Sequence, residues 1–177
     1  MAVAASCGAW SLVRARAGDP SAALADAWRG REKPLLLVIV VGETARAANW
    51  GLSGYARQTT PELAKEDVIN FSDVTACGTN TEVSLPCMFS PFGRHAYDET
   101  RIRNSESLLH VLRRAGFRVA WLDNQSGCKG TCADIETWRP DAASAPGMCD
   151  SHGCLDAALV AGMQRFVGDS RGNTALV

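Results

Sequence analysis

The chain has no long apolar segment. Its longest uninterrupted apolar run is Leu35 to Val41, which ends at Gly42. A helix that spans a bilayer needs about 20 consecutive apolar residues, so the sequence predicts no membrane-spanning helix. An excess of positive charge is also missing, because 18 Lys+Arg face 19 Asp+Glu among the 177 residues. Nucleic-acid affinity depends on a basic surface, and the sequence therefore argues against a nucleic-acid partner.

Histidine is scarce as well, with three residues in the chain. His95 and His152 lie in expected loops without a carboxylate at metal-site spacing, and His110 lies on an expected helix as a surface or boundary residue. A catalytic triad built on histidine is therefore not indicated.

The composition is that of a single globular domain. The chain is 46% hydrophobic and 21% charged with a mean hydropathy of -0.07, and 177 residues form one sizeable core. Strand and helix patterns alternate, which predicts an α/β fold with a mostly parallel sheet. The apolar run from Leu35 to Val41 predicts a central strand buried on both faces. The later segments are a helix from Ser105 to Ala115, a strand from Phe117 to Leu122, a helix from Leu155 to Val167 and a strand from Asn173 to Val177.

The first 33 residues differ from the rest in composition. Residues 1–33 are rich in Ala and Arg and contain a turn signal at Gly18-Asp19-Pro20, after which Ser21 begins a short helical pattern that reaches Trp28. They lack the charge and apolar pattern of a secretory signal peptide. We interpret 1–33 as a linker or aberrant leader, and 34–177 as the folded domain.

Cysteine is abundant, and six of the seven residues form close pairs in the sequence: Cys77 and Cys87, Cys128 and Cys132, and Cys149 and Cys154. Short-range disulfides would indicate an oxidising compartment such as a periplasm. The second and third pairs, with His152 between Cys149 and Cys154, also fit a structural zinc site, and reduced thiols in a cytosolic protein are a further alternative. Spacing alone leaves these alternatives open, and Cys7 has no near partner.

Glu43 follows the strongest strand pattern directly, in the sequence G-E-T-A-R. Functional groups in open α/β sheets collect at the carboxyl ends of strands, and a carboxylate there is a suitable ligand for a divalent metal. The alternative is an acidic residue that stabilises the N-terminus of a short helix, which we expect to begin near Thr44.

A second polar cluster is C-G-T-N-T-E-V-S-L-P-C, in which Cys77 and Cys87 bracket Thr79 and Thr81. At the start of a helix, backbone N–H groups and a hydroxyl form a phosphate site, and a base or metal would make Thr81 a nucleophile. The alternative is an ordinary Thr-capped helix. Lys129 lies between two cysteines beside polar residues, where it would bind a phosphate or simply face solvent.

Several of these motifs occur together in one known family. They are V-V-G-E-T-A-R-A-A-N, the following G-Y-x-R-x-T-x-P, V-I-N-F-S-D-V-T-A-C-G-T-N-T-E-V-S-L-P-C-M-F-S, Y-D-E and D-N-Q-S-G-C-K-G-T-C. From about Pro34 to Val177 the chain resembles the first part of the soluble catalytic domain of phosphoethanolamine transferases that modify lipid A. This family includes the mobile colistin-resistance enzymes and belongs to the alkaline phosphatase/sulfatase superfamily.

The resemblance implies an alkaline phosphatase-like α/β/α sandwich and a specific activity. Glu43 would be a Zn²⁺ ligand, and Thr81 would be the zinc-bound nucleophile that carries phosphoethanolamine from phosphatidylethanolamine to lipid A, a modification that gives polymyxin resistance. Asn124, Gln125 and Lys129 would contact the head group. The six paired cysteines would form periplasmic disulfides, at the outer face of the bacterial inner membrane.

The departures from the family pattern carry expectations of their own. The family's membrane-spanning helices and later zinc ligands have no counterpart in this sequence. We therefore expect the chain to bind zinc weakly and to transfer little phosphoethanolamine by itself. The chain is also expected to be a monomer. We also expect an incomplete sheet, truncated at its C-terminal side, with the last strand as an exposed edge. A hydrolase of the same superfamily, an inactive fragment and a cysteine-rich redox or zinc-binding module remain alternatives.

Overall fold

The computed structural model describes Asp26 and residues 33–177. Its main feature is a four-stranded sheet in the order β1-β6-β2-β3, in which every neighbouring pair is parallel. The strands are β1 (Leu36–Val38), β2 (Arg118–Leu122), β3 (Glu136–Trp138) and β6 (Thr174–Leu176), and a separate antiparallel pair consists of β4 (Cys149–Asp150) and β5 (Gly153–Cys154). The predicted α/β fold with a parallel sheet is confirmed. The linker expected over 1–33, with its short helix, lies outside the described residues except for Asp26 and Lys33.

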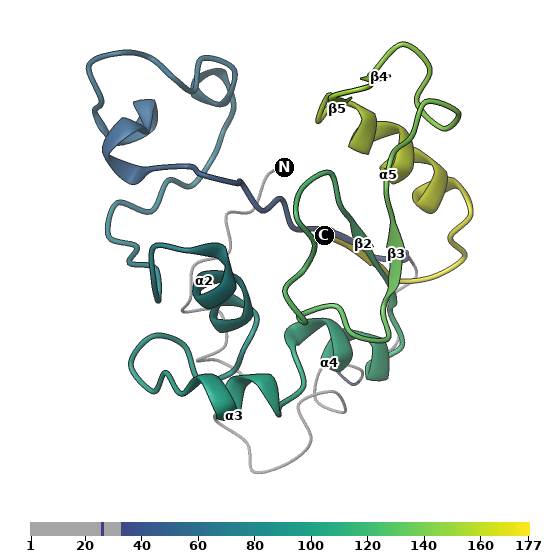
Figure 1. Ribbon diagram of the computed structural model, residues 1–177, viewed down its shortest axis with the longest axis horizontal. Coiled ribbons are helices and arrows are strands. Elements are labelled where there is room, and N and C mark those ends of the chain that lie inside the picture. The colour runs from purple at the N-terminus through teal and green to yellow at the C-terminus, as the bar shows by residue number, and fades with distance from the viewer. Residues whose placement is uncertain (1–25, 27–32) are drawn as a thin grey trace.

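Helices connect the strands (Figure 1). The α-helices are α2 (Thr81–Met88), α3 (Glu99–Arg103), α4 (Leu108–Arg114) and α5 (Ala158–Gly168), and the 3₁₀ helices are η2 (Ala47–Asn49), η3 (Gly51–Ser53) and η4 (Leu63–Lys65). The predicted helices from Ser105 and from Leu155 are confirmed as α4 and α5, each shorter by a few residues. The helix expected near Thr44 is wrong: Thr44 has a φ of 56°, in the left-handed region, and the first helical turn after it is η2. A residue in that region cannot start a right-handed helix.

The order of strands differs from the sequence prediction at two places. The last strand, β6, lies between β1 and β2 and all three of its residues are buried, so the expected exposed edge there is wrong. The expected central strand, β1, instead forms one edge of the described sheet, and Leu36 is 45% exposed. An apolar run indicates a strand, but its position in the sheet depends on pairing with residues more than a hundred positions away, such as Leu37 with Ala175.

Three strands were missed, namely β3 and the short antiparallel pair β4 and β5. Residues 123–153 have a loop-like composition, yet Glu136–Trp138 forms β3 at the other edge of the sheet. Its first two residues are exposed and the third is half-buried. A short edge strand of this kind lacks the apolar run that would have indicated it.

The sheet is covered on both faces, which gives the α/β/α sandwich (Figure 1). Side chains alternate along β2, so Val119 and Trp121 face one layer while Ala120 faces the other. Leu109 of α4 packs in the first layer and Phe166 of α5 packs in the second. No helix among the described residues is long and apolar enough to cross a membrane.

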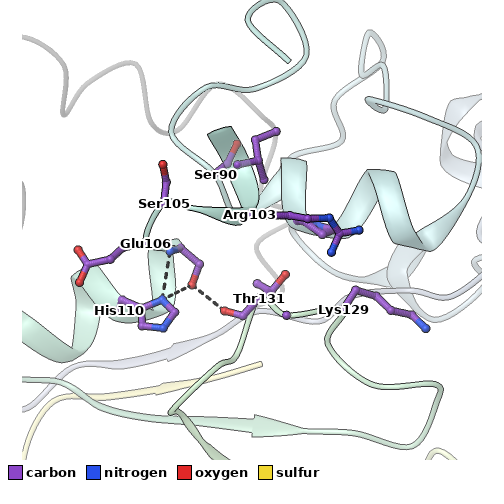
Figure 2. A pocket seen from close by; sticks show the side chains of 11 residues that line it. Ser90, Arg103, Ser105, Glu106, His110, Lys129 and Thr131 are labelled. Atoms are coloured by element: carbon purple, nitrogen blue, oxygen red, sulfur yellow. Dashed lines mark hydrogen bonds between the residues drawn. The ribbon is translucent and has the colours of Figure 1, made fainter. Parts of the chain in front are cut away.

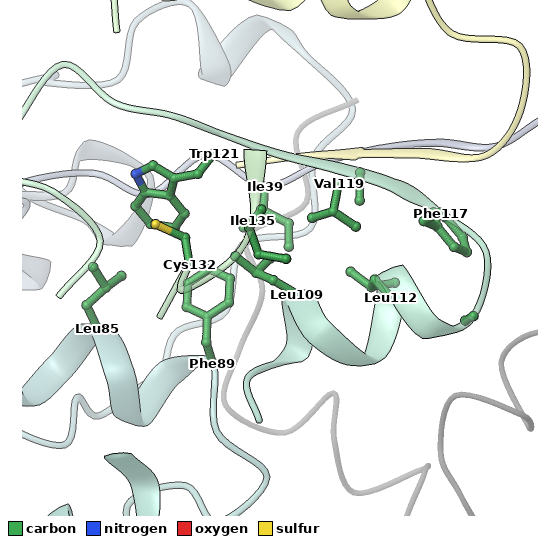
Figure 3. Packing of buried hydrophobic residues seen from close by; sticks show 12 residues of the cluster. Ile39, Leu85, Phe89, Leu109, Leu112, Phe117, Val119, Trp121, Cys132 and Ile135 are labelled. Carbon is green, nitrogen blue, oxygen red and sulfur yellow. The ribbon is translucent and has the colours of Figure 1, made fainter. Parts of the chain in front are cut away.

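The larger core joins α2 to the sheet (Figure 3). Leu85 on α2 and Phe89 at its end are buried in this cluster, and the rings of Phe89 and Trp121 meet edge to face with centroids 6.0 Å apart. The backbone oxygen of Phe89 also accepts a hydrogen bond from the Leu108 N–H at 2.8 Å. Because of these contacts the C-terminal half of α2 is fixed, and its N-terminal turn has a defined position above the sheet.

The contact of α5 with β3 predicts a specific sensitivity at Gly162. A Cβ atom on this glycine would lie 2.6 Å from Cε3 and 2.9 Å from Cη2 of Trp138, too close for any real contact. We expect Gly162→Ala to lower the free energy of unfolding by about 1–3 kcal/mol, because overpacking outweighs the better helix propensity of alanine. Gly168 is a matched control on the same helix with no atom within 4 Å of its added Cβ. Urea unfolding that showed equal stability for both variants would contradict the expected overpacking.

Candidate active site

Glu43 and Thr81 lie side by side, although 38 positions separate them in the sequence. Glu43 follows the β1 segment, and Thr81 is the first residue of α2. The Thr81 Oγ1 hydroxyl donates to the carboxylate at 3.4 Å from Oε1 and 3.3 Å from Oε2. Glu43 is exposed and Thr81 is half-buried, so a ligand reaches both side chains from solvent. The structure therefore brings together the two residues that the sequence singled out for chemistry.

The start of α2 leaves the Thr81 hydroxyl available. Asn80 is the N-cap, and its Oδ1 accepts a hydrogen bond from the Val83 N–H at 2.9 Å. The capping role that the sequence pattern offered to Thr79 or Thr81 therefore belongs to Asn80, whose residue type is a strong capping signal in itself. Thr81 occupies the first helical position, where backbone N–H groups have no partner inside the helix.

Three disulfide bonds are present, and they confirm the pairing of the six cysteines. The bond between Cys77 and Cys87 closes the loop that precedes α2, and its Cα atoms are 6.3 Å apart. Cys87 is fully buried, so the bond ties this loop to the core. The other two disulfide bonds are Cys128–Cys132 and Cys149–Cys154. Because these cysteines are bonded to each other, the alternative of a structural zinc site at these two pairs is wrong. Cys7 lies outside the described residues.

Lys129 lies beside the first turn of α2. Its Nζ is 3.0 Å from Oε1 of Glu82, the residue after Thr81, and its side chain is only 17% exposed. Lys129 has a backbone φ of 52°, in the left-handed region. Two glycines of the same loop, Gly127 and Gly130, also have positive φ angles. Glu82 is a residue that the sequence analysis missed, because nothing in the local pattern links it to a lysine 47 positions away.

Asn124 and Gln125 have different surroundings. The Asn124 Nδ2 donates to the backbone oxygen of Cys154 and to Oδ1 of Asp156, both at 2.8 Å, so this amide ties the end of β2 to the segment before α5. Gln125 is exposed, and its backbone N–H donates to Oδ1 of Asp123 at 3.2 Å. No hydrogen bond joins either side chain to Glu43 or Thr81 within the described part of the chain.

Asp123 is a second residue that the sequence analysis missed. It is 6% exposed, forms an ion pair with Arg139, and accepts hydrogen bonds from the backbone N–H groups of Gln125 and Gly127. Buried carboxylates require such partners. Asp123 therefore shapes the loop that leads from β2 toward Lys129, and its position directly after a strand was the available signal.

Glu43 and Thr81 are the residues that would hold a metal ion. Their three side-chain oxygens converge and are open to solvent, which suits a divalent cation. No third His, Cys, Asp or Glu joins them to form a cluster among residues 33–177 or Asp26. These residues therefore fit part of a zinc site, since such sites take three or four protein ligands.

Comparison with protein families gives a match that covers most of the chain. The family described as Sulfatase matches residues 36–176. The chain belongs to the sulfatase family. Its fold is that of this family and of alkaline phosphatase, with the parallel sheet described above.

This sulfatase-family chain is also similar to curated proteins of one named activity. Phosphoethanolamine transferase EptA from Escherichia coli K12 is 39% identical over 142 residues, which cover 80% of this chain and 26% of that protein. Phosphatidylethanolamine transferase Mcr-1 from Escherichia coli is 41% identical over 152 residues, which cover 82% of this chain and 28% of Mcr-1. The chain thus spans about a quarter of the length of these relatives.

Solved structures agree with this grouping. The soluble domain of lipooligosaccharide phosphoethanolamine transferase A from Neisseria meningitidis superposes with a TM-score of 0.76 at 42% identity, over 84% of this sulfatase-family chain and 45% of that domain. The integral membrane form of the same protein superposes with a TM-score of 0.74 at 42% identity, over 84% of this chain and 28% of that protein.

Proposed function

We propose that the chain is part of the catalytic domain of a phosphoethanolamine transferase in which Thr81 is the nucleophile. The observation that carries the proposal is the contact between the Thr81 hydroxyl and the Glu43 carboxylate at the first turn of α2. The similarity to relatives named phosphoethanolamine transferases supports it. The domain boundary at residue 34 stays a prediction.

The proposed reaction has two displacements at phosphorus. The Thr81 oxygen attacks the phosphorus of phosphatidylethanolamine, and the bond to the glycerol oxygen breaks. Diacylglycerol leaves with a proton that balances the one lost by Thr81. A phosphate oxygen of lipid A then attacks the same phosphorus, and the bond from phosphorus to the Thr81 oxygen breaks. A proton from the attacking phosphate group restores the Thr81 hydroxyl. Glu43 and Thr81 are the residues that would hold a zinc ion, and a bound zinc ion would supply positive charge that favours loss of the hydroxyl proton.

The residues around Thr81 assist in separate ways. The free N–H groups in the first turn of α2 attract the anionic phosphoryl group. The bond between Cys77 and Cys87 restrains the loop before Thr81, so the hydroxyl keeps its position. Lys129 adds a positive charge beside the helix start, and we propose that it contacts the head group together with Asn124 and Gln125, as the resemblance implies. For Asn124 this requires a contact beyond those it makes with Cys154 and Asp156.

The proposed location is the periplasmic face of a bacterial inner membrane. Three disulfide bonds within one small domain are typical of oxidising compartments. A relative of solved structure is described as an integral membrane protein, which supports this location. A membrane location would keep the domain next to the proposed lipid substrates.

A hydrolase is the second candidate, because the matching family is described as Sulfatase. In that case water, rather than a lipid phosphate, would displace Thr81. The first displacement is common to both functions, so the acceptor distinguishes them.

A hybrid protein tests the proposal. The 142 aligned residues of this chain replace the matching segment of Escherichia coli EptA, and the hybrid is expressed in cells that lack their own transferase. We expect the mass of lipid A to increase by one phosphoethanolamine group, and survival in polymyxin to rise. Release of phosphoethanolamine into water from a soluble phosphodiester, at the same rate with and without lipid A, would support the hydrolase instead.

A further inference from the structure

A pocket of about 120 Å³ lies along the flank of α2, and neither Glu43 nor Thr81 is among the residues that line it (Figure 2). It is formed by the C-terminal half of α2, the end of α3, the start of α4 and the loop that carries Lys129. Its volume suits a small polyatomic ion or one group of a larger ligand. Of the residues that line the pocket, the mechanism proposed above uses only Lys129.

Thr131 has an unpaired hydroxyl in this pocket. The residue is 4% exposed, and its Oγ1 has no hydrogen-bond partner among the described residues. Figure 2 shows the side chain directed into the pocket toward Arg103. A buried hydroxyl without a partner costs free energy, typically about 1–3 kcal/mol. A ligand oxygen in the pocket would provide the missing partner.

The other hydroxyl groups that line the pocket are all satisfied. Ser90 Oγ donates to the backbone oxygen of Cys87 at 3.0 Å, and Ser105 Oγ donates to that of Arg101 at 2.7 Å. Ser107 Oγ donates to the backbone oxygen of Thr131 at 2.8 Å. Thr131 is therefore an exception in its own surroundings.

Positive charge dominates the lining. Arg103 and Lys129 both line the pocket, while their carboxylate partners, Glu99 and Glu82, do not. Arg103 uses its Nε for Glu99 at 2.8 Å, and Lys129 uses Nζ for Glu82 at 3.0 Å. A guanidinium has five N–H donors and an ammonium has three, so both retain donors for a ligand.

The one acidic residue in the lining is turned away from these cations. Glu106 forms an ion pair with Arg114, and Figure 2 shows its carboxylate on the opposite side from the Arg103 guanidinium. With two cationic residues and one acidic residue, the lining favours an anion over a cation.

We propose that this pocket is an oxyanion-binding site that takes a phosphate group through Arg103, Lys129 and the Thr131 hydroxyl. Arginine and lysine are the common protein ligands of phosphate, and a threonine hydroxyl supplies a directed hydrogen bond. Because Lys129 also pairs with Glu82, the site adjoins the first turn of α2 and the Thr81 nucleophile. Binding of phosphate there does not depend on transfer activity. The identity of the phosphate as part of the lipid acceptor rests on the proposed function.

The test is a titration of the 177-residue chain with inorganic phosphate, in which the amide NMR signals are monitored. EDTA is present to exclude bound metal. We expect saturable shifts at the amides of Gly130 and Thr131. Thr131→Val and Arg103→Gln are each expected to weaken phosphate binding by about tenfold or more, since each removes a donor to a charged ligand.

Two residues of α3 that do not line the pocket serve as matched controls. Thr100→Val and Arg101→Gln are expected to bind phosphate as the wild type does. Thr131→Val is expected to be at least as thermally stable as the wild type, because it removes an unpaired buried hydroxyl. Unchanged affinity in both Thr131→Val and Arg103→Gln would overturn the proposal. So would shifts centred on Thr81 and Glu82 instead of Gly130 and Thr131.

A second titration distinguishes the two sources of phosphate. If the ligand is part of the acceptor, the 1-phosphate of an amino sugar should bind more tightly than inorganic phosphate, with the same loss in Arg103→Gln. Equal or weaker binding of the sugar phosphate would show that the bound phosphate group is not part of the lipid acceptor. The site would then be assigned to free phosphate. In either case the binding of inorganic phosphate is decided separately, so failure of the transferase proposal is not confused with failure of this site.

Discussion

Replacing Thr81 with Ala is expected to abolish transfer of phosphoethanolamine in the hybrid protein. The substitution removes the only side-chain oxygen that contacts Glu43 from α2. Loss of a nucleophile lowers turnover by at least about a thousandfold in enzymes that form a covalent intermediate. The measurement is the fraction of lipid A that gains one phosphoethanolamine group in the hybrid and in its variant.

Two further variants make this result specific. Thr79→Ala removes a hydroxyl from the same disulfide-bonded loop. It is expected to retain transfer because Thr79 is exposed, and the hydroxyl groups that bond to the Glu43 carboxylate in the described structure are those of Thr44 and Thr81. Thr81→Ser keeps a hydroxyl at the same position and should restore part of the activity. Transfer by Thr81→Ala within tenfold of the parent would rule out Thr81 as the nucleophile.

Leu109→Ala is expected to cost about 2–5 kcal/mol of unfolding free energy, the range for a fully buried leucine. Leu109 is 0% exposed and lies in the core cluster where α4 packs against the sheet. The same cluster contains Phe89, so its loosening also affects the end of α2. Urea unfolding followed by circular dichroism gives the change in free energy.

The matched control is Leu155→Ala. Leu155 is 66% exposed, so the same change of side chain removes little buried surface there and should alter stability by less than about 0.5 kcal/mol. Similar losses for the two variants would show that the cluster around Leu109 is not the core that holds the domain together.

Local patterns in the sequence predicted the helices and strands whose apolar residues have a recognisable spacing or form an apolar run. The helical spacing of Leu108, Leu109 and Leu112 predicted α4, and the short apolar run after Gly116 predicted β2. Both elements bury a continuous apolar face, and burial of that face is what produces the periodicity. The family motifs around Glu43 and Thr81 likewise indicated both residues of the site before any geometry was available.

Long-range pairing was not predictable in the same way. The sheet order places β6 at the centre and β1 at an edge, and it adds β3, whose residues have no apolar pattern. Strand order depends on backbone pairs that are distant in the sequence, such as Leu36 with Thr174 and Arg118 with Thr174. A single sequence contains no direct record of those partners.

The sequence by itself determined the α/β class, the helices α4 and α5, a helix start near Thr81, the choice of Glu43 and Thr81 as candidate site residues, and the likeness to phosphoethanolamine transferases. The tertiary structure confirmed the disulfides that the resemblance implied. It alone decided that Asn124 binds Cys154 and Asp156, and that Glu82 meets Lys129. It also revealed the unpaired hydroxyl of Thr131 beside Arg103. The physical reason is the range of the interactions: periodicity and motifs reflect neighbours along the chain, whereas ion pairs, disulfides and unpaired groups depend on distances that only the folded backbone sets.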